Sequence, residues 1–219
     1  MTAIIGFRRK GSCVLVADGL RSNRSSPDAP LGNSKDVTKL HRLSSNLMVA
    51  QGGDSCVTDK AICILKTTTG NRRLKCIEDA IKVLQLNGAS WADDIAARWD
   101  RQLTTYLVFG TIGESGFGRH VSYSLNNLTI SFDEEKAGSY YTGSDTKKIE
   151  NTLRNVSARL NLPEAGQLSD KQIRQLTQQA LSEISNQMPK EIGSHGMIGT
   201  LKAKGTPRLV VKRLPALHS

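Results

Sequence analysis

The stretch that decides the fold is the N-terminal segment Thr2-Ala3-Ile4-Ile5-Gly6-Phe7, followed after a basic turn by Cys13-Val14-Leu15-Val16-Ala17-Asp18-Gly19. Both segments are short, apolar and rich in β-branched residues, and the connecting residues 8–12 include a glycine. This pattern predicts a β-hairpin that starts at the very first residues. The hairpin places Asp18 at the end of a strand.

Further strands and helices follow in separate blocks. Residues 22–34 are rich in Pro, Gly, Ser and Asn and predict a loop. A second strand pair is expected in 39–43 and 47–50 and ends at Gly52-Gly53. Helical spacing begins at Asp54, where Asp54 or Ser55 can cap the first turn. A further helical stretch is expected over about 77–104, with Trp91, Ile95 and Trp99 on one stripe that indicates core packing.

The second half of the chain repeats this order. Strands are expected in 106–112 and 120–124, joined by a glycine-rich turn that lacks the order of a phosphate-binding loop. Two helices are expected near 144–160 and 169–187, and a last hairpin pairs 196–201 with 209–214. Strands and helices are thus segregated, which favours an α+β fold with sheets stacked between helix layers over alternating βαβ units.

Composition limits the classes of function. The chain has 219 residues, which suits one domain, taken as 2–219. Its net charge of +10 suggests an acidic partner. However, residues 1–110 carry 16 basic and 10 acidic side chains and the remainder carries 14 and 10, so no basic block favours nucleic acid.

No apolar run approaches the roughly 20 residues of a membrane span, and no signal peptide is evident, so a cytoplasmic protein without a membrane partner is expected. The scattered cysteines and histidines do not predict zinc.

The second residue carries the most informative chemistry. Methionine is normally removed before a residue as small as threonine, and removal of Met1 would make Thr2 the N-terminus. Its hydroxyl is a nucleophile, and its α-amine, with an ordinary pKa of about 7.7 to 8.0, is a usable general base near neutral pH. Such a site also needs a cation beside the amine and a carboxylate to orient that cation. Asp18 and Lys39 meet these two requirements.

Several motifs together resemble a known family. They are Thr2–Gly6 with Arg8–Gly11, Val16–Gly19, Val37–Leu43 and Gly52-Gly53. Their order and spacing are similar to those of HslV and proteasome β-subunits, which are N-terminal nucleophile hydrolases with a four-layer αββα sandwich. The proteasome homologue of beta-proteobacteria is as similar as HslV. More loosely, residues 142–145 resemble the family's Gly-Ser-Gly turn and residues 191–196 its Asp-x-x-Ser-Gly-Gly segment.

The resemblance implies a role for each matching residue. It makes Thr2 the nucleophile, with Asp18 and Lys39 as the charged pair beside it. The remaining implied positions are a polar cluster around the amine (Ser144, Glu191, Ser194), an oxyanion hole (Gly52), substrate-binding positions (Leu20, Ser22, Ala50, Asp54) and a structural monovalent or divalent cation held by the carbonyls of Met188, Glu191 and Ser194. No cofactor is required.

Several of these positions have alternative interpretations or depart from the family pattern. The loop before Lys39 is longer than in the family, so Lys35 competes as the catalytic lysine, although Lys39 is followed by a strand in the expected phase. Asp54 either favours basic residues in a substrate or caps the following helix. Glu191 stands where the family has aspartate, and Asp145 and His195 stand where it has glycines.

The function implied is a self-compartmentalising threonine endopeptidase that degrades unfolded polypeptides. By resemblance, its subunits would form two stacked hexameric or heptameric rings. Because the sequence lacks a Walker motif, any AAA+ unfoldase would be a separate chain. The altered Glu191 and Asp145 motivate an alternative, in which the chain forms a proteasome-like ring that has lost peptidase activity and acts as a scaffold or binding chamber.

Overall fold

The computed structural model describes residues 2–21, 35–71, 74, 76–97, 104–143, 145–203 and 208–216. They contain two five-stranded antiparallel sheets and one two-stranded ladder. The first sheet has the order β10 (Gly138–Gly143), β1 (Ala3–Arg9), β2 (Ser12–Asp18), β11 (Gly196–Lys202), β12 (Arg208–Leu214). The second has the order β5 (Leu40–Arg42), β6 (Met48–Gly52), β7 (Tyr106–Ile112), β8 (Gly118–Ser124), β9 (Ile130–Glu135). The ladder pairs β3 (Leu20–Arg21) with β4 (Lys35–Asp36).

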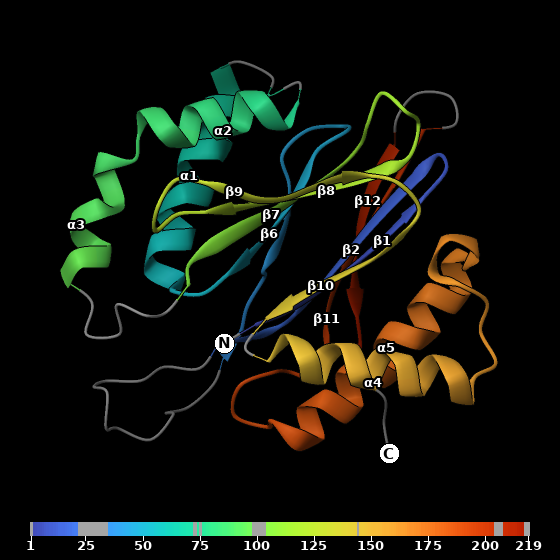
Figure 1. The fold of residues 1–219 in the computed structure, drawn as a ribbon. Coiled ribbons are helices and arrows are strands. Elements are labelled where there is room, and N and C mark those ends of the chain that lie inside the picture. Colours follow the sequence, from blue (N-terminus) through green and yellow to red (C-terminus); the bar gives the residue numbers. More distant parts are fainter. Residues whose placement is uncertain are drawn as a thin grey trace.

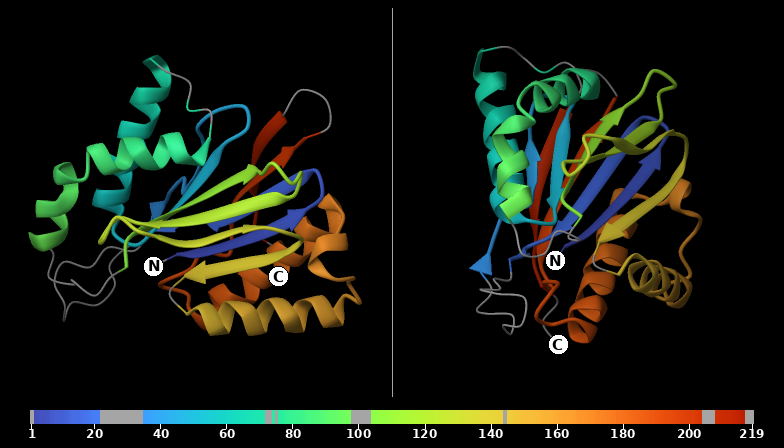
Figure 2. Two further views of the ribbon diagram at one scale, coloured as in Figure 1. Left: turned by 45° about the horizontal axis from the view of Figure 1, so that its top comes forward. Right: turned by 60° about the vertical axis from the view of Figure 1, so that its left-hand side comes forward.

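The helices form two groups on opposite sides of the strands (Figures 1 and 2). The first group is α1 (Ser55–Asn71), α2 (Ile77–Leu86) and α3 (Ala89–Ala97). The second group is α4 (Thr146–Arg159) and α5 (Asp170–Gln187), with the short 3-10 helix η1 (Ala165–Gln167) between them. Among the described residues, no helix combines the length and the apolar character needed to cross a membrane.

Three apolar clusters connect these elements. One joins α1–α3 to the second sheet and includes Trp91 and Phe109. Another joins α4 and α5 to the first sheet and includes Ile5. The third takes side chains from both sheets, for example Leu15 from β2 and Val108 from β7. The chain therefore has the predicted α+β class, with each helix group packed on its own sheet and a shared core between strands of the two sheets.

Most predicted elements are confirmed. The N-terminal hairpin is β1 paired with β2, and Gly11 in its turn has a φ of 69°, a conformation that glycine adopts without steric penalty. The second strand pair is β5 and β6, and the glycine-rich segment after β7 is a hairpin turn closed by the N–H of Gly113 donating to the carbonyl of Phe117 at 2.9 Å. Residues 22–34, predicted as a loop, and the turn 204–207 lie outside the described residues.

The prediction of one helix over about 77–104 was wrong. Helix α2 ends at Leu86 and α3 begins at Ala89. At the break, the Asn87 side chain donates to the carbonyl of Val83 at 2.8 Å, and the next residue is Gly88, which weakens a helix interior by about 1 kcal/mol relative to alanine. Thr104 and Thr105 precede strand β7 instead of ending a helix, and residues 98–103 lie outside the described residues.

Strands β9 and β10 were not predicted. Strand β9 is one of the two edge strands of the second sheet, and β10 is one of the two edge strands of the first. Their sequences, ISFDEE and GSYYTG, lack the long apolar β-branched runs of the inner strands. Because an edge strand can form with little burial, β9 and β10 lack the apolar signal that made the other edge strands, β5 and β12, predictable.

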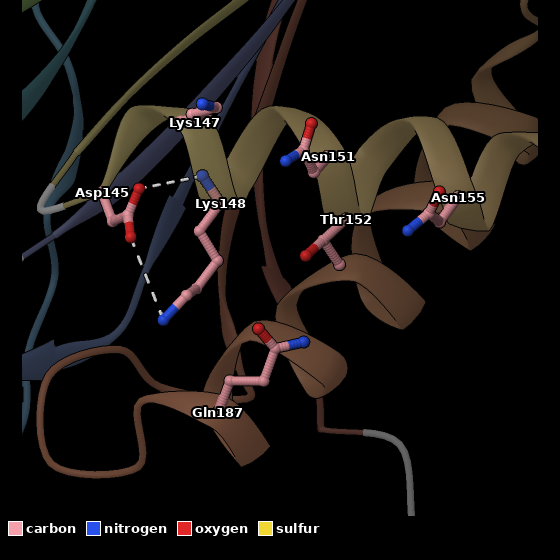
Figure 3. Close-up of a pocket in the computed structure, with 7 residues that line it drawn as sticks. All are labelled: Asp145, Lys147, Lys148, Asn151, Thr152, Asn155 and Gln187. Atoms are coloured by element: carbon pink, nitrogen blue, oxygen red, sulfur yellow. Dashed lines mark hydrogen bonds and ion pairs between the residues drawn. The ribbon is translucent and has the colours of Figure 1, made fainter.

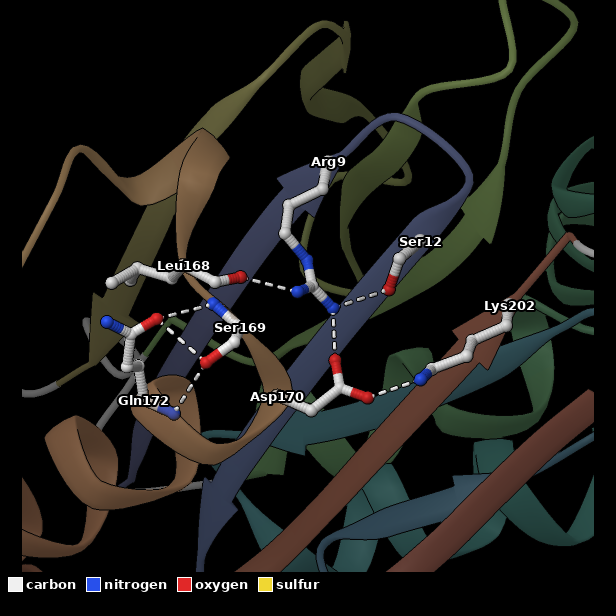
Figure 4. Close-up of polar contacts among 7 residues, drawn as sticks. All are labelled: Arg9, Ser12, Leu168, Ser169, Asp170, Gln172 and Lys202. Carbon is white, nitrogen blue, oxygen red and sulfur yellow. Dashed lines mark hydrogen bonds and ion pairs between the residues drawn. The ribbon is translucent and has the colours of Figure 1, made fainter.

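Polar contacts join the start of α5 to the turn end of the β1–β2 hairpin, where Arg9 and Ser12 lie (Figure 4). Ser169 and Gln172 form a capping box. The Arg9 guanidinium donates to the carbonyl of Leu168, to the hydroxyl of Ser12 at 2.9 Å and to the carboxylate of Asp170. This network holds α5 against the first sheet.

Candidate functional site

Thr2 lies immediately before β1 and is almost fully buried, with 4% of its surface exposed. Its neighbour Ala3 pairs with Gly143 on β10. A Cβ atom at Gly143 would lie 2.2 Å from the carbonyl oxygen of Thr2, so glycine is required for this close approach. Strand pairing therefore fixes the main chain around Thr2.

Asp18 and Lys39 form a buried ion pair. Asp18 ends β2 and is fully buried, and Lys39 is 5% exposed. The Lys39 ammonium donates to both carboxylate oxygens of Asp18, at 3.0 Å and 3.1 Å. Of the two candidate lysines, Lys39 is thus the one in contact with Asp18, while Lys35 lies in β4 opposite Arg21.

Asp18 also accepts three backbone hydrogen bonds. Its Oδ1 accepts the N–H of Ala3 at 2.8 Å, and its Oδ2 accepts the N–H of Leu20 at 3.1 Å and of Gly193 at 3.2 Å. These donors come from the start of β1, from β3 and from the segment before β11. One carboxylate therefore joins the residue after Thr2 to Lys39 and to the C-terminal half of the chain.

Burial controls the electrostatics of Lys39. Removal from water lowers the pKa of the Lys39 ammonium, and the Asp18 carboxylate opposes this by favouring the charged form. Arg21 adds a smaller lowering of the same pKa. A pair desolvated in this way has a stronger mutual attraction than the same pair in water.

Gly52 and Gly53 are constrained by their neighbours. Gly52 ends β6 opposite Tyr106, and a Cβ atom there would lie 2.5 Å from the Tyr106 ring. Gly53 has a φ of 91°, and its Cβ would lie 2.4 Å from the carbonyl oxygen of Thr104. The preceding residue, Gln51, donates its N–H to the carbonyl of Lys39 at 2.9 Å, which places this glycine pair next to the strand that follows Lys39.

The predicted substrate-binding residues occupy different environments. Leu20 is 9% exposed and begins the two-stranded ladder. Ala50 is fully buried in the cluster between the two sheets. Asp54 caps α1, because its Oδ1 accepts the N–H of Cys56 at 2.8 Å and of Val57 at 3.3 Å. Ser22 lies outside the described residues.

The segment 191–194, which holds two residues of the predicted polar cluster, reaches Asp18 through its backbone. Gly193, between Glu191 and Ser194, is the residue that donates to Asp18. In the described part of the chain, the half-buried side chain of Glu191 makes no hydrogen bond or ion pair. The carbonyl of Met188, a predicted cation ligand, accepts the N–H groups of Glu191 and Ile192 at 3.0 Å and 3.1 Å. Ser144 lies outside the described residues.

The sequence reasoning did not anticipate the part played by His195. Its carbonyl accepts the N–H of Gly19 at 2.9 Å, and its Nε2 lies 2.9 Å from Oδ1 of Asp36. A Cβ atom at Gly19 would lie 2.7 Å from that Nε2, so the imidazole covers the residue next to Asp18. The signal available in the sequence was the departure from the family glycine at this position.

Scans of the chain against models of known protein families and against curated proteins found no match.

Proposed function

We propose that the chain is a threonine-type endopeptidase with the αββα sandwich of N-terminal nucleophile hydrolases. The single observation that carries this proposal is the position of Asp18, whose carboxylate binds both the N–H of Ala3 and the ammonium of Lys39. A nucleophile at Thr2 would thus have a fixed main chain and a cation oriented by a buried carboxylate. The arrangement of two sheets with a shared core and a helix group on each is consistent with the proposed sandwich.

In the proposed reaction, removal of Met1 exposes the α-amine of Thr2. The amine takes the proton from the Thr2 hydroxyl as Oγ1 attacks the carbonyl carbon of a peptide bond. The N–H of Gly52 stabilises the oxyanion, and the Lys39 ammonium keeps the nearby amine in its neutral form. The amine then gives the proton to the leaving nitrogen as the C–N bond breaks.

The acyl-enzyme that results is an ester on Thr2. A water molecule, deprotonated by the same amine, attacks the ester carbonyl, and the C–O bond to Thr2 breaks as the hydroxyl regains a proton. The product leaves with a new carboxylate. Nucleophile and base belong to one residue, so the reaction needs no separate histidine.

The proposal extends to the assembly and location of the protein. The substrates are unfolded polypeptides, and the active sites face a chamber formed by two stacked rings of six or seven subunits in the cytoplasm. A separate AAA+ unfoldase would feed the chamber. A structural cation near residues 188–194 belongs to the same proposal, but the carbonyl of Met188 already accepts two backbone hydrogen bonds.

A second candidate is a ring of the same fold that serves as a scaffold or binding chamber without peptidase activity. The observation in its favour is the side chain of Glu191, which makes no polar contact with the described residues. In an active site, this carboxylate would be expected to help orient the amine of Thr2.

Cleavage of fluorogenic peptides by wild type, Thr2→Ser and Thr2→Ala separates the two candidates. The peptidase proposal predicts that Thr2→Ala abolishes cleavage and that Thr2→Ser, which keeps a hydroxyl, retains part of it. Thr67→Ala, which removes the hydroxyl of an exposed threonine on α1, should cleave like wild type. Intact mass must also show loss of Met1, and undiminished cleavage by Thr2→Ala would refute the assignment.

A further inference from the structure

A polar groove lies between α4 and the C-terminal end of α5 (Figure 3), and none of its lining residues is among those assigned to the proposed active site, although Asp145 follows Ser144 and Gln187 precedes Met188. Its volume is about 380 Å³. All of its lining residues are polar or charged: Asp145, Lys147, Lys148, Asn151, Thr152, Asn155 and Gln187. Pockets for small organic ligands are mostly apolar with a few polar groups, so this lining favours a ligand that is rich in hydrogen-bonding groups.

The charges around the groove favour an anion. Two lysines stand against one carboxylate, Asp145, which leaves a formal excess of one positive charge (two minus one). Asp145 is also occupied, because its Oδ1 accepts the N–H of Lys148 at 2.9 Å and its Oδ2 lies 3.9 Å from the Lys148 ammonium. The N-terminal end of α4 borders the groove and attracts negative charge, but the C-terminal end of α5 on the other side has the opposite partial charge, so the lysines carry the preference for an anion.

The nearly buried side chain of Thr152 offers the groove a hydroxyl that no other described residue uses. Thr152 is 5% exposed and lines the groove. Within the described residues it makes no hydrogen bond, whereas Thr177 on α5 satisfies its hydroxyl by donating to the carbonyl of Ile173 at 2.8 Å. The Thr152 hydroxyl therefore remains available to a ligand in the groove, to which it can donate one hydrogen bond and from which it can accept others.

The side-chain amides indicate what the rest of the ligand is. Asn151 and Asn155 lie one helical turn apart on α4, and Gln187 lies across the groove on α5 (Figure 3). Each amide both donates and accepts hydrogen bonds, as the main chain of a peptide does. The lysine ammonium groups are strong donors to a carboxylate.

We propose that this groove binds the C-terminal end of an extended polypeptide. The terminal carboxylate lies beside Lys147 and Lys148, and the last peptide groups lie along Asn151, Asn155 and Gln187. The hydroxyl of Thr152 donates to the same segment. The proposal needs no cleavage of the peptide and is independent of the chemistry proposed at Thr2.

Fluorescence anisotropy with an N-terminally labelled hexapeptide of alternating alanine and serine tests this proposal on the full-length chain. The peptide with a free C-terminal carboxylate should bind at least about ten-fold more tightly than its C-terminally amidated twin. The double variant Lys147→Met with Lys148→Met should weaken binding of the free-acid peptide by about ten-fold, and Thr152→Val by several-fold. Lys171→Met, which removes an exposed lysine of α5 that does not line the groove, should leave binding unchanged.

Equal binding of the two peptides, no loss in the double lysine variant, or no binding of the free-acid peptide at about 1 mM would each overturn the proposal. Competition identifies the source of the carboxylate. Acetate that binds as tightly as the peptide would show that the amides contribute nothing, and inorganic phosphate that displaces the peptide more effectively than acetate would show that the groove prefers another anion. Either result would also overturn the proposal. Circular dichroism of each variant verifies that it is folded.

Discussion

The carboxylate of Asp18 lies within 3.1 Å of the Lys39 ammonium through both of its oxygens, and both side chains are buried. Taking two charges out of water is unfavourable, and only their attraction and further hydrogen bonds offset this. Asp18 obtains those additional bonds from the backbone of Ala3, Leu20 and Gly193. A buried pair with this much support has a structural role, and it fixes the Lys39 ammonium on the carboxylate that also binds the N–H next to Thr2.

Separating the structural from the chemical role of this pair requires a double variant. Lys39→Met leaves the buried Asp18 without a counter-charge and should lower the free energy of unfolding by about 3–5 kcal/mol. Adding Asp18→Asn removes the uncompensated charge and should restore part of that stability. Peptidase activity should be lost in the single variant and in the double variant, because neither has the ammonium. Urea unfolding and peptide cleavage measure the two effects, and cleavage by Lys39→Met at the wild-type rate would contradict the proposed role.

Asp54 offers a test between its two possible roles. Its carboxylate accepts N–H groups of Cys56 and Val57, so Asp54→Ala should lower the free energy of unfolding by about 1 kcal/mol. Asp54→Asn is the matched variant, since asparagine caps as well but carries no charge. If capping is the whole role, Asp54→Asn keeps wild-type stability and the same ratio of cleavage rates for basic and neutral peptides. A lower ratio in Asp54→Asn would instead assign Asp54 to substrate selection.

How far the sequence could predict the site depends on the distance between partners. Thr2, Asp18 and Lys39 could be selected as candidates because the chemistry of an N-terminal nucleophile requires these groups and the sequence resembles a family that has them in the same order. The N–H of Gly193 could not be selected, because it reaches Asp18 from 175 positions away and any residue with an N–H could supply that bond. Ala50, assigned to a substrate pocket by resemblance, is fully buried between the sheets.

For the fold too, the sequence predicts only the features that have a local pattern. Inner strands such as β1 and β2 are buried on both faces, and their continuous apolar runs make them visible in the sequence. The break after α2 depends on a local competition, in which the side chain of Asn87 takes the carbonyl of Val83. Helical periodicity continues on both sides of that break, so the pattern alone predicted one helix where there are two.

A buried histidine makes stability depend on pH. His120 is fully buried, its Nε2 lies 3.1 Å from Sγ of Cys13, and Gly6 leaves room for its ring, since a Cβ there would lie 2.3 Å from Cε1. Burial, with a smaller effect of Arg8, lowers the pKa of His120 to about 3 from its ordinary 6.5. Between about pH 3 and pH 6.5, His120 is therefore protonated in the unfolded chain and neutral in the folded chain. The stabilisation is complete above pH 6.5 and is lost as the pH falls towards 3.

His120→Gln isolates this contribution. The difference in unfolding free energy between wild type and His120→Gln should shrink by on the order of 1 kcal/mol per pH unit between pH 6.5 and about pH 3, because glutamine does not titrate. Urea unfolding at several pH values measures this difference and cancels the effects of groups common to both proteins. A difference that stays constant across the range would contradict a neutral, buried His120.

The contacts of Arg9 at the start of α5 give a last test, with a matched control in α4. Arg9 donates to Ser12, Leu168 and Asp170, and its side chain is 14% exposed. Arg9→Met leaves the nearly buried carbonyl of Leu168 without that donor, so the free energy of unfolding should fall by about 1–3 kcal/mol. Arg154, 74% exposed, pairs with Glu150 within one helical turn, so Arg154→Met should change stability by less than about 0.5 kcal/mol. Similar losses in the two variants, measured by urea unfolding, would show that the network in Figure 4 does not anchor the helix.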